Sequence, residues 1–153
     1  AYISTKKGFG NAVLTGLQFL SQKYDYIVTM DGDGKHIYPN VEDDLNQNTL
    51  YIFCRKNNPR LISRLGNWLA NKRLHLNGID VTHGLKIYPK SLIPYLKLDF
   101  INNSFAWQIY AVKMALKHGF KIECLDATRY YFPHKNEKIR LWQTALSLIE
   151  VLI

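Results

Sequence analysis

The sequence predicts an α/β sandwich with a mostly parallel sheet and flanking helices. Apolar, β-branched runs of strand length alternate along the chain with segments whose apolar residues recur every three to four positions. The chain has 153 residues, of which 47% are hydrophobic, so we expect one domain over residues 1–153 with a single core. In open α/β sheets, ligands bind beyond the carboxyl ends of the strands.

Taken in order, the elements follow from these patterns and from their punctuation. Asn11 is the expected N-cap of the first helix, and Gly78 and Gly119 are the expected ends of two later helices. Pro39 begins an acidic stretch that is typical of a helix start. The expected strands are residues 1–4, 24–30, 50–54, a short run before Pro89, 121–125 and an extended segment over 129–132. The expected helices are residues 11–20, 39–45, 61–76, 89–96, 105–118 and 141–153.

The most informative stretch is the end of the second of these strands. An apolar run stops at Asp31 and Asp33, and a glycine follows each aspartate. The glycines allow a positive φ and a close approach of the backbone to a ligand. Two carboxylates at a strand end suit Mg²⁺ or Mn²⁺, which in turn can hold phosphates. The alternative interpretation is an ordinary turn, because Asp-Gly is common turn chemistry.

Net charge and cysteine content narrow the choice of partner and compartment. The formal net charge of +8 favours anionic partners such as nucleotide phosphates, lipid phosphates, an anionic membrane or nucleic acid. The sequence contains no run of about 18 apolar residues, so it predicts no membrane span. Residues 1–7 lack the apolar segment of a signal peptide. Cys54 and Cys124 occur singly, so we expect unpaired core thiols and a reducing, cytosolic setting.

Two basic segments are candidate anion sites. Lys7, Gly8 and Gly10 precede the first helix, where backbone N–H groups and lysines form a natural phosphate site. An ordinary loop–helix junction explains the same residues equally well. The segment 60–73 carries Arg60, Arg64, Lys72 and Arg73, and is either a solvated basic helix or a binding surface. His36 and His83 are expected to be structural or surface residues.

Five segments, in order, resemble the GT-A glycosyltransferases of family 2, in the branch of dolichol-phosphate mannosyltransferases and other polyprenyl-phosphate glycosyltransferases. Residues 8–16 resemble the family's glycine-rich helix start, and residues 31–39 its Asp-x-Asp-Gly-Gln-His-x-Pro metal motif. Residues 63–67 resemble its Ser-Arg-x-x-Asn helix, and residues 80–90 its Asp-x-x-x-Gly-Phe-Arg segment. Residues 105–125 are similar to the helix and strand before its basic C-terminal loop.

The resemblance implies a GT-A fold, which is Rossmann-like, and roles for individual residues. Asp31 and Asp33 would bind a divalent metal, Mg²⁺ or Mn²⁺, that bridges the diphosphate of a GDP- or UDP-sugar. Asp80 and Gln108 would form the catalytic centre, with Asp80 shaping the sugar and acceptor pocket. Donor or lipid phosphates would contact a basic set: Lys7, Gly8, Gly10, Arg64, Lys135, Lys138 and Arg140.

The implied reaction is the inverting transfer of a sugar to a polyprenyl phosphate or a related acceptor, by a protein attached peripherally to the cytosolic face of a membrane. Because the acceptor phosphate is already anionic, no strong catalytic base is required. No specific nucleic-acid partner is expected, and binding of nucleic acid through residues 60–73 is the weakest alternative.

Several departures from the family favour another alternative, a degenerate and non-catalytic module that binds anionic ligands through its basic face. Lys35 replaces a metal-side glutamine, Gln108 stands where the family usually has glutamate, and Phe9 replaces a lysine between two glycines. The family's opening strands, with its Asp-Asp-Gly-Ser nucleoside motif, do not occur in the sequence. We therefore expect either an N-terminally incomplete domain or a reduced protein.

Overall fold

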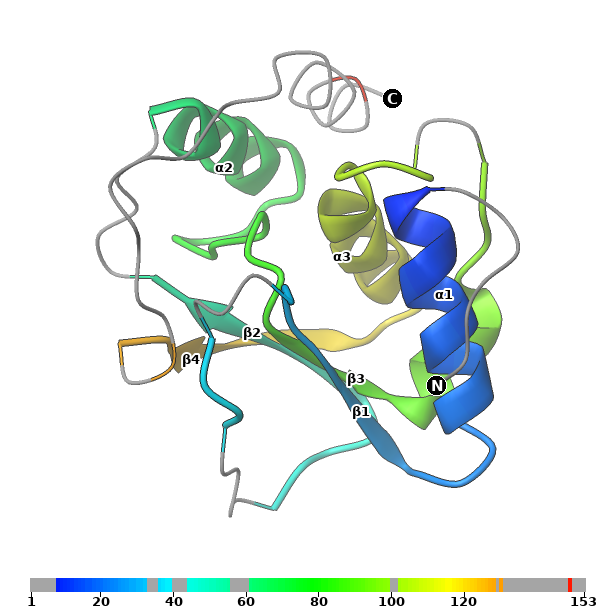
Figure 1. Ribbon diagram of the computed structural model, residues 1–153. Helices are drawn as coiled ribbons and strands as arrows, with labels where there is room; N and C mark the ends of the chain where they lie inside the picture. The colour runs from blue at the N-terminus through cyan, green and yellow to red at the C-terminus, as the bar shows by residue number, and fades with distance from the viewer. Residues whose placement is uncertain are drawn as a thin grey trace.

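A computed structural model describes residues 8–32, 36–39, 44–55, 61–99, 102–128, 130 and 149. Over these residues the chain has a mixed α/β fold, with helices packed on a four-stranded sheet (Figure 1). The elements are α1 Phe9–Leu20, β1 Tyr26–Thr29, β2 Thr49–Cys54, α2 Leu61–Arg73, β3 Lys86–Pro89, the 3₁₀ helix η1 Lys90–Tyr95, α3 Trp107–Lys117 and β4 Lys121–Asp126.

Strand direction departs from the expected mostly parallel sheet. The strand order is β1-β3-β2-β4, and β3 runs antiparallel to both of its neighbours, whereas β2 and β4 are parallel. The chain leaves β2 at its carboxyl end, forms α2, and re-enters the sheet at that same edge. It must therefore run back along the sheet as β3. The start of β3 consequently lies beside the carboxyl ends of β1 and β2.

The two central strands, β2 and β3, are buried along their whole length, whereas the edge strand β4 is largely exposed. Leu50 and Ile52 pack in the larger cluster, which includes residues of α1 and α3 on one face of the sheet (Figure 1). Tyr51 and Phe53 point to the other face, where they pack in a smaller cluster with Ile87 of β3. This alternation follows from the two-residue repeat of a strand, and it fixes the side of the sheet that each side chain enters.

Most expected elements lie within a few residues of the observed ones, but three helix expectations are wrong. Gly78 does not end the helix expected over 61–76, because α2 stops at Arg73. Asn11 is not the N-cap of α1; Gly8 holds that position, and Asn11 is buried in the first turn. Residues 37–39 and 44–46 are not helical, so the helix expected over 39–45 is absent from the described residues of that range. Gly119 ends α3 with a φ of 78°, as expected. Residues 1–4 and nearly all of 141–153 lie outside the described residues.

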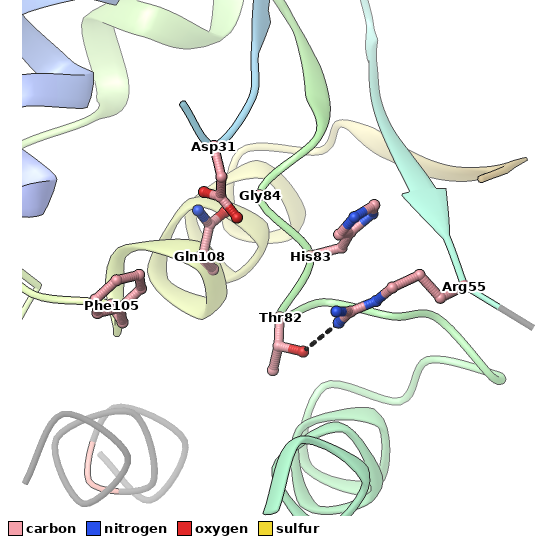
Figure 2. A pocket seen from close by; sticks show the side chains of 7 residues that line it. All are labelled: Asp31, Arg55, Thr82, His83, Gly84, Phe105 and Gln108. Carbon is pink, nitrogen blue, oxygen red and sulfur yellow. Dashed lines mark hydrogen bonds between the residues drawn. The ribbon is translucent and has the colours of Figure 1, made fainter. Parts of the chain in front are cut away.

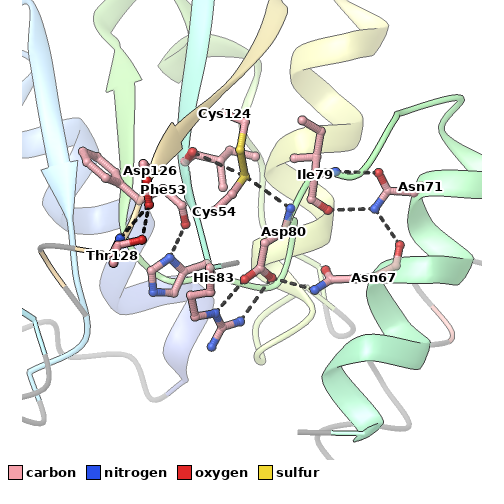
Figure 3. The surroundings of a disulfide bond; sticks show 12 residues. Phe53, Cys54, Asn67, Asn71, Ile79, Asp80, His83, Cys124, Asp126 and Thr128 are labelled. Carbon is pink, nitrogen blue, oxygen red and sulfur yellow. Dashed lines mark hydrogen bonds and ion pairs between the residues drawn. A yellow bond between two sulfur atoms is a disulfide. The ribbon is translucent and has the colours of Figure 1, made fainter. Parts of the chain in front are cut away.

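Cys54 and Cys124 form a disulfide bond, which contradicts the expectation of unpaired thiols (Figure 3). The cause is strand pairing: β2 and β4 are parallel neighbours, and they bring the two Cα atoms to 5.7 Å. Cys54 Sγ also accepts a hydrogen bond from the backbone N–H of Asp80 at 3.4 Å. The two cysteines therefore give no support for a reducing compartment.

Candidate functional site

A small pocket lies at the edge of the sheet where β1 and β2 end and β3 begins (Figure 2). Its volume is about 80 Å³, which suits a few water molecules or one compact polar group. The lining residues come from the ends of these strands, from the loop before β3 and from the beginning of α3. They are Asp31, Arg55, Thr82, His83, Gly84, Phe105 and Gln108.

Asp31 enters this pocket because Gly84 leaves room for its carboxylate. Thr29, the last residue of β1, donates from Oγ1 to the Gly84 carbonyl oxygen at 3.0 Å and so joins the two segments. A Cβ atom added at Gly84 would lie 2.6 Å from Asp31 Oδ1, well inside van der Waals contact. Glycine is thus required here for the close approach of a side chain. The strand-end position predicted for Asp31 is the position observed.

Gln108 presents its amide nitrogen to the pocket because Lys86 binds its oxygen. Lys86 is fully buried, and its Nζ donates to Gln108 Oε1 at 2.5 Å, to the Val81 carbonyl at 3.1 Å and to the His83 carbonyl. An ammonium group has three donors and no acceptor, so these three oxygens satisfy it. Figure 2 shows the Gln108 amide nitrogen turned toward Asp31. Burial lowers the pKa of Lys86 to about 7, against the opposing attraction of nearby carboxylates.

Asp80 lies behind the pocket in a satisfied ion pair (Figure 3). Its Oδ2 accepts from Arg55 Nε at 2.6 Å, and its Oδ1 accepts from Asn67 Nδ2 at 2.6 Å and from Thr82 Oγ1 at 3.0 Å. Burial alone would raise the pKa of Asp80, but the hydrogen bonds and charge of Arg55 outweigh it and hold the pKa below its ordinary value. Asp80 therefore remains ionised and does not itself line the pocket.

Arg55 is a charged pocket residue that the sequence interpretation missed. It follows β2 directly, as Asp31 closely follows β1, so a polar residue at a strand end was the available signal. Its guanidinium group also donates to Thr82 Oγ1 at 3.3 Å (Figure 2). The Asp80 carboxylate fixes this guanidinium in place. The negative charge predicted at Asp80 thus acts on the pocket through Arg55.

His83 and His36 form a directed pair beside this ion pair. His83 Nδ1 bonds to the Phe53 carbonyl oxygen, which can only accept, so Nδ1 carries the proton. His83 Nε2 is therefore the acceptor in its 3.0 Å contact with His36 Nε2, and His36 donates. Burial, together with the positive charge of Arg55, lowers the pKa of His83 to about 3. His83 is thus a neutral, structural histidine, as expected from the sequence.

The start of α1 is covered by the turn at residues 102–103. A Cβ atom at Gly8 would lie 2.1 Å from Asn103 Oδ1, and one at Gly10 would lie 2.2 Å from the Asn102 carbonyl oxygen. Gly8 also has a φ of 127°, a conformation that favours glycine. The Asn103 side chain accepts a hydrogen bond from the Asn11 N–H at 2.8 Å. One backbone donor of the predicted phosphate site is therefore used within the protein.

The first turn of α1 nevertheless lies next to the pocket. Phe9 stacks on Phe105, which lines the pocket, with ring centroids 4.6 Å apart. Arg64 by contrast is exposed on α2 and does not line the pocket. The other predicted site residues lie outside the described residues: Lys7, Asp33, Lys135, Lys138 and Arg140.

Among the described residues, no group of three or more His, Cys, Asp or Glu side chains is arranged to hold a metal ion. Of the two predicted metal ligands, Asp31 and Asp33, the structure describes the position of Asp31. No protein-family model matches the chain, and no solved structure matches it significantly. In the described part of the chain, none of the helices combines the length and the hydrophobicity needed to cross a bilayer.

Proposed function

We propose that the chain is a metal-dependent glycosyltransferase domain of the GT-A type. It would transfer a sugar from a GDP- or UDP-sugar to a polyprenyl phosphate or a related acceptor. The observation that carries the proposal is the convergence of Asp31, Gly84 and Gln108 in one pocket. These residues come from three of the five segments that resemble the family, and they are distant in sequence.

Asp31 fits the proposed role of a metal ligand. Its carboxylate is a hard oxygen ligand that borders a polar pocket, and Gly84 leaves space beside it. Asp33 would be the second ligand. A bound Mg²⁺ or Mn²⁺ would neutralise charge on the departing nucleoside diphosphate.

Arg55 and Gln108 supply hydrogen-bond donors rather than a base. The Gln108 oxygen is engaged by Lys86, so its Nε2 can donate to a hydroxyl or phosphate oxygen of a ligand. The Arg55 guanidinium, held by Asp80, is suited to a phosphate or carboxylate oxygen. Apart from Asp31, the proposed metal ligand, none of the described lining residues offers a free base, which is consistent with an acceptor that is already an anionic phosphate.

The same geometry favours the second candidate, a non-catalytic module that binds anionic ligands. Asp80 is committed to Arg55, and Gln108 is an amide, so neither residue can accept a proton during turnover. The two candidates share the prediction of anion binding at the pocket. They differ in whether sugar transfer follows.

Isothermal titration calorimetry of the wild-type chain with Mn²⁺ and with GDP or UDP tests the proposal. We expect nucleotide binding that requires Mn²⁺ and that Asp31→Asn weakens at least tenfold, because a ligand carboxylate is lost. Asp25→Asn is the matched control, because Asp25 precedes β1 at the opposite end of the strand. Metal-independent binding, or equal binding by both variants, would refute the metal site at Asp31.

A transfer assay then separates enzyme from binding module. Radiolabelled GDP-mannose or UDP-glucose is incubated with a short-chain polyprenyl phosphate and Mn²⁺, and label in the organic phase is counted. Transfer that Asp31→Asn abolishes supports the enzyme. Nucleotide binding without transfer from either donor supports the binding module.

A further inference from the structure

The outer face of α2 carries two large apolar side chains and two cations that are exposed to solvent. Trp68 is 59% exposed and Leu65 is 52% exposed. Arg64 and Lys72 are exposed on the same side of the helix, because a step of 100° per residue places positions 64, 65, 68 and 72 within about one third of a turn. We refer to these four residues as the α2 outer face.

The charge of α2 complements an anionic surface. The helix Leu61–Arg73 contains Arg64, Lys72 and Arg73 and no acidic residue. Lys72 Nζ lies 5.5 Å from the centroid of the Trp68 ring, so the cation and the aromatic ring occupy one patch. Tryptophan beside lysine and arginine is typical of a protein surface that enters the headgroup layer of a bilayer.

The side of α2 next to the outer face is tied to the candidate site. Asn67 Nδ2 donates to Asp80, and Asn67 Oδ1 accepts from the Thr82 N–H at 3.1 Å. Asn71 bonds to both backbone groups of Ile79 at 2.7 and 2.8 Å. A surface that docks on the α2 outer face would therefore lie beside the loop that borders the pocket.

We propose that the α2 outer face docks on the surface of an anionic phospholipid bilayer, with Trp68 and Leu65 in the interface and the cations at the headgroups. The choice of a membrane rests in part on the proposed function, because a polyprenyl phosphate is held in a bilayer. It also rests on Leu65 and Trp68, since apolar side chains gain from the interface and a nucleic-acid phosphate backbone offers leucine no partner.

The test is sedimentation of the full chain with vesicles of phosphatidylcholine alone or mixed with phosphatidylglycerol, without metal or nucleotide. We expect binding to the mixed vesicles and a blue shift of Trp fluorescence. Trp68→Ser should weaken binding about tenfold through lost apolar burial, and Arg64→Gln and Lys72→Gln about fivefold each. Tyr24→Ser is the matched control, because Tyr24 is 57% exposed at the far end of β1 and should bind as wild type.

Failure of the wild-type chain to bind phosphatidylglycerol vesicles would overturn the proposal, and so would equal binding by Trp68→Ser. Binding to a single-stranded oligonucleotide that the same variants weaken, without vesicle binding, would assign the surface to nucleic acid instead. Because the vesicle assay contains no metal or nucleotide, its failure is distinguishable from a failure of the pocket to bind a nucleotide.

Discussion

Replacing His83 by asparagine should remove a large part of the acid sensitivity of the fold. His83 is buried with its Nε2 accepting from His36, and Arg55 and Lys86 both oppose a positive charge on the ring, while Asp80 partly offsets them. Burial is the largest cause of the lowered pKa, about 3 in the folded protein. Asparagine keeps an amide N–H near the position of Nδ1 and cannot be protonated in this range.

The magnitude follows from proton linkage. The unfolded chain protonates His83 near its ordinary pKa of about 6.5, whereas the folded chain resists protonation until about pH 3. The stability contributed by neutral His83 is therefore complete above about pH 6.5 and is lost as the pH falls toward 3. Between about pH 7.5 and pH 5 the wild type should lose about 2 kcal/mol of unfolding free energy through this one side chain.

Urea unfolding followed by circular dichroism, in the presence of a chelator, measures this loss. The wild type should lose about 2 kcal/mol more than His83→Asn over that pH interval. Between about pH 7.5 and pH 9 the two curves should run parallel, because His83 is neutral in both states there. An equal acid loss in both proteins would refute the neutral, buried state of His83.

Three further predictions concern packing in and near the site. Arg55→Met leaves the buried carboxylate of Asp80 without its counter-charge and should lower the unfolding free energy in urea by about 3–5 kcal/mol. A loss below about 1 kcal/mol would contradict a buried ion pair. Gly84→Ala places a Cβ 2.6 Å from Asp31 Oδ1 and should weaken Mn²⁺ binding at least tenfold by calorimetry, whereas unchanged affinity would separate Asp31 from the metal. Gly10→Ala places a Cβ 2.2 Å from a backbone carbonyl oxygen and should lower the unfolding free energy by about 1–3 kcal/mol in thermal unfolding. Gly16→Ala meets nothing within 4 Å and should raise the unfolding free energy by about 0.5–1 kcal/mol. Equal effects of the two substitutions would refute the contact at Gly10.

The elements that could be read from the sequence are those with a strong local signal. β2 is an uninterrupted apolar run, and α3 has a helical repeat that stops at Gly119. The place of Asp31 also followed from local pattern, because a buried strand that stops at a carboxylate presents that carboxylate at the edge of the sheet. Local pattern sufficed for these elements, although it failed for the helix expected over 39–45.

Pairing between distant segments could not be read in the same way. Nothing in residues 86–89 indicates that β3 would run antiparallel between two other strands. Lysine side chains are ordinarily exposed, yet Lys86 is fully buried because two backbone carbonyls and Gln108 solvate its ammonium group. The ion pair of Arg55 with Asp80 spans 25 residues, and the Cys54–Cys124 bond spans 70. Each of these contacts depends on strand order, which no local pattern specifies.

The charges around the pocket bear on how the proposed ligands would bind. Asp80 balances Arg55, and among the described residues Lys86, behind Gln108, is a further buried cation that interacts with Asp31. A buried cation near a metal ligand disfavours a free divalent ion but favours the anionic diphosphate. Under the proposed function, the metal and the nucleotide diphosphate would therefore bind better together than either does alone.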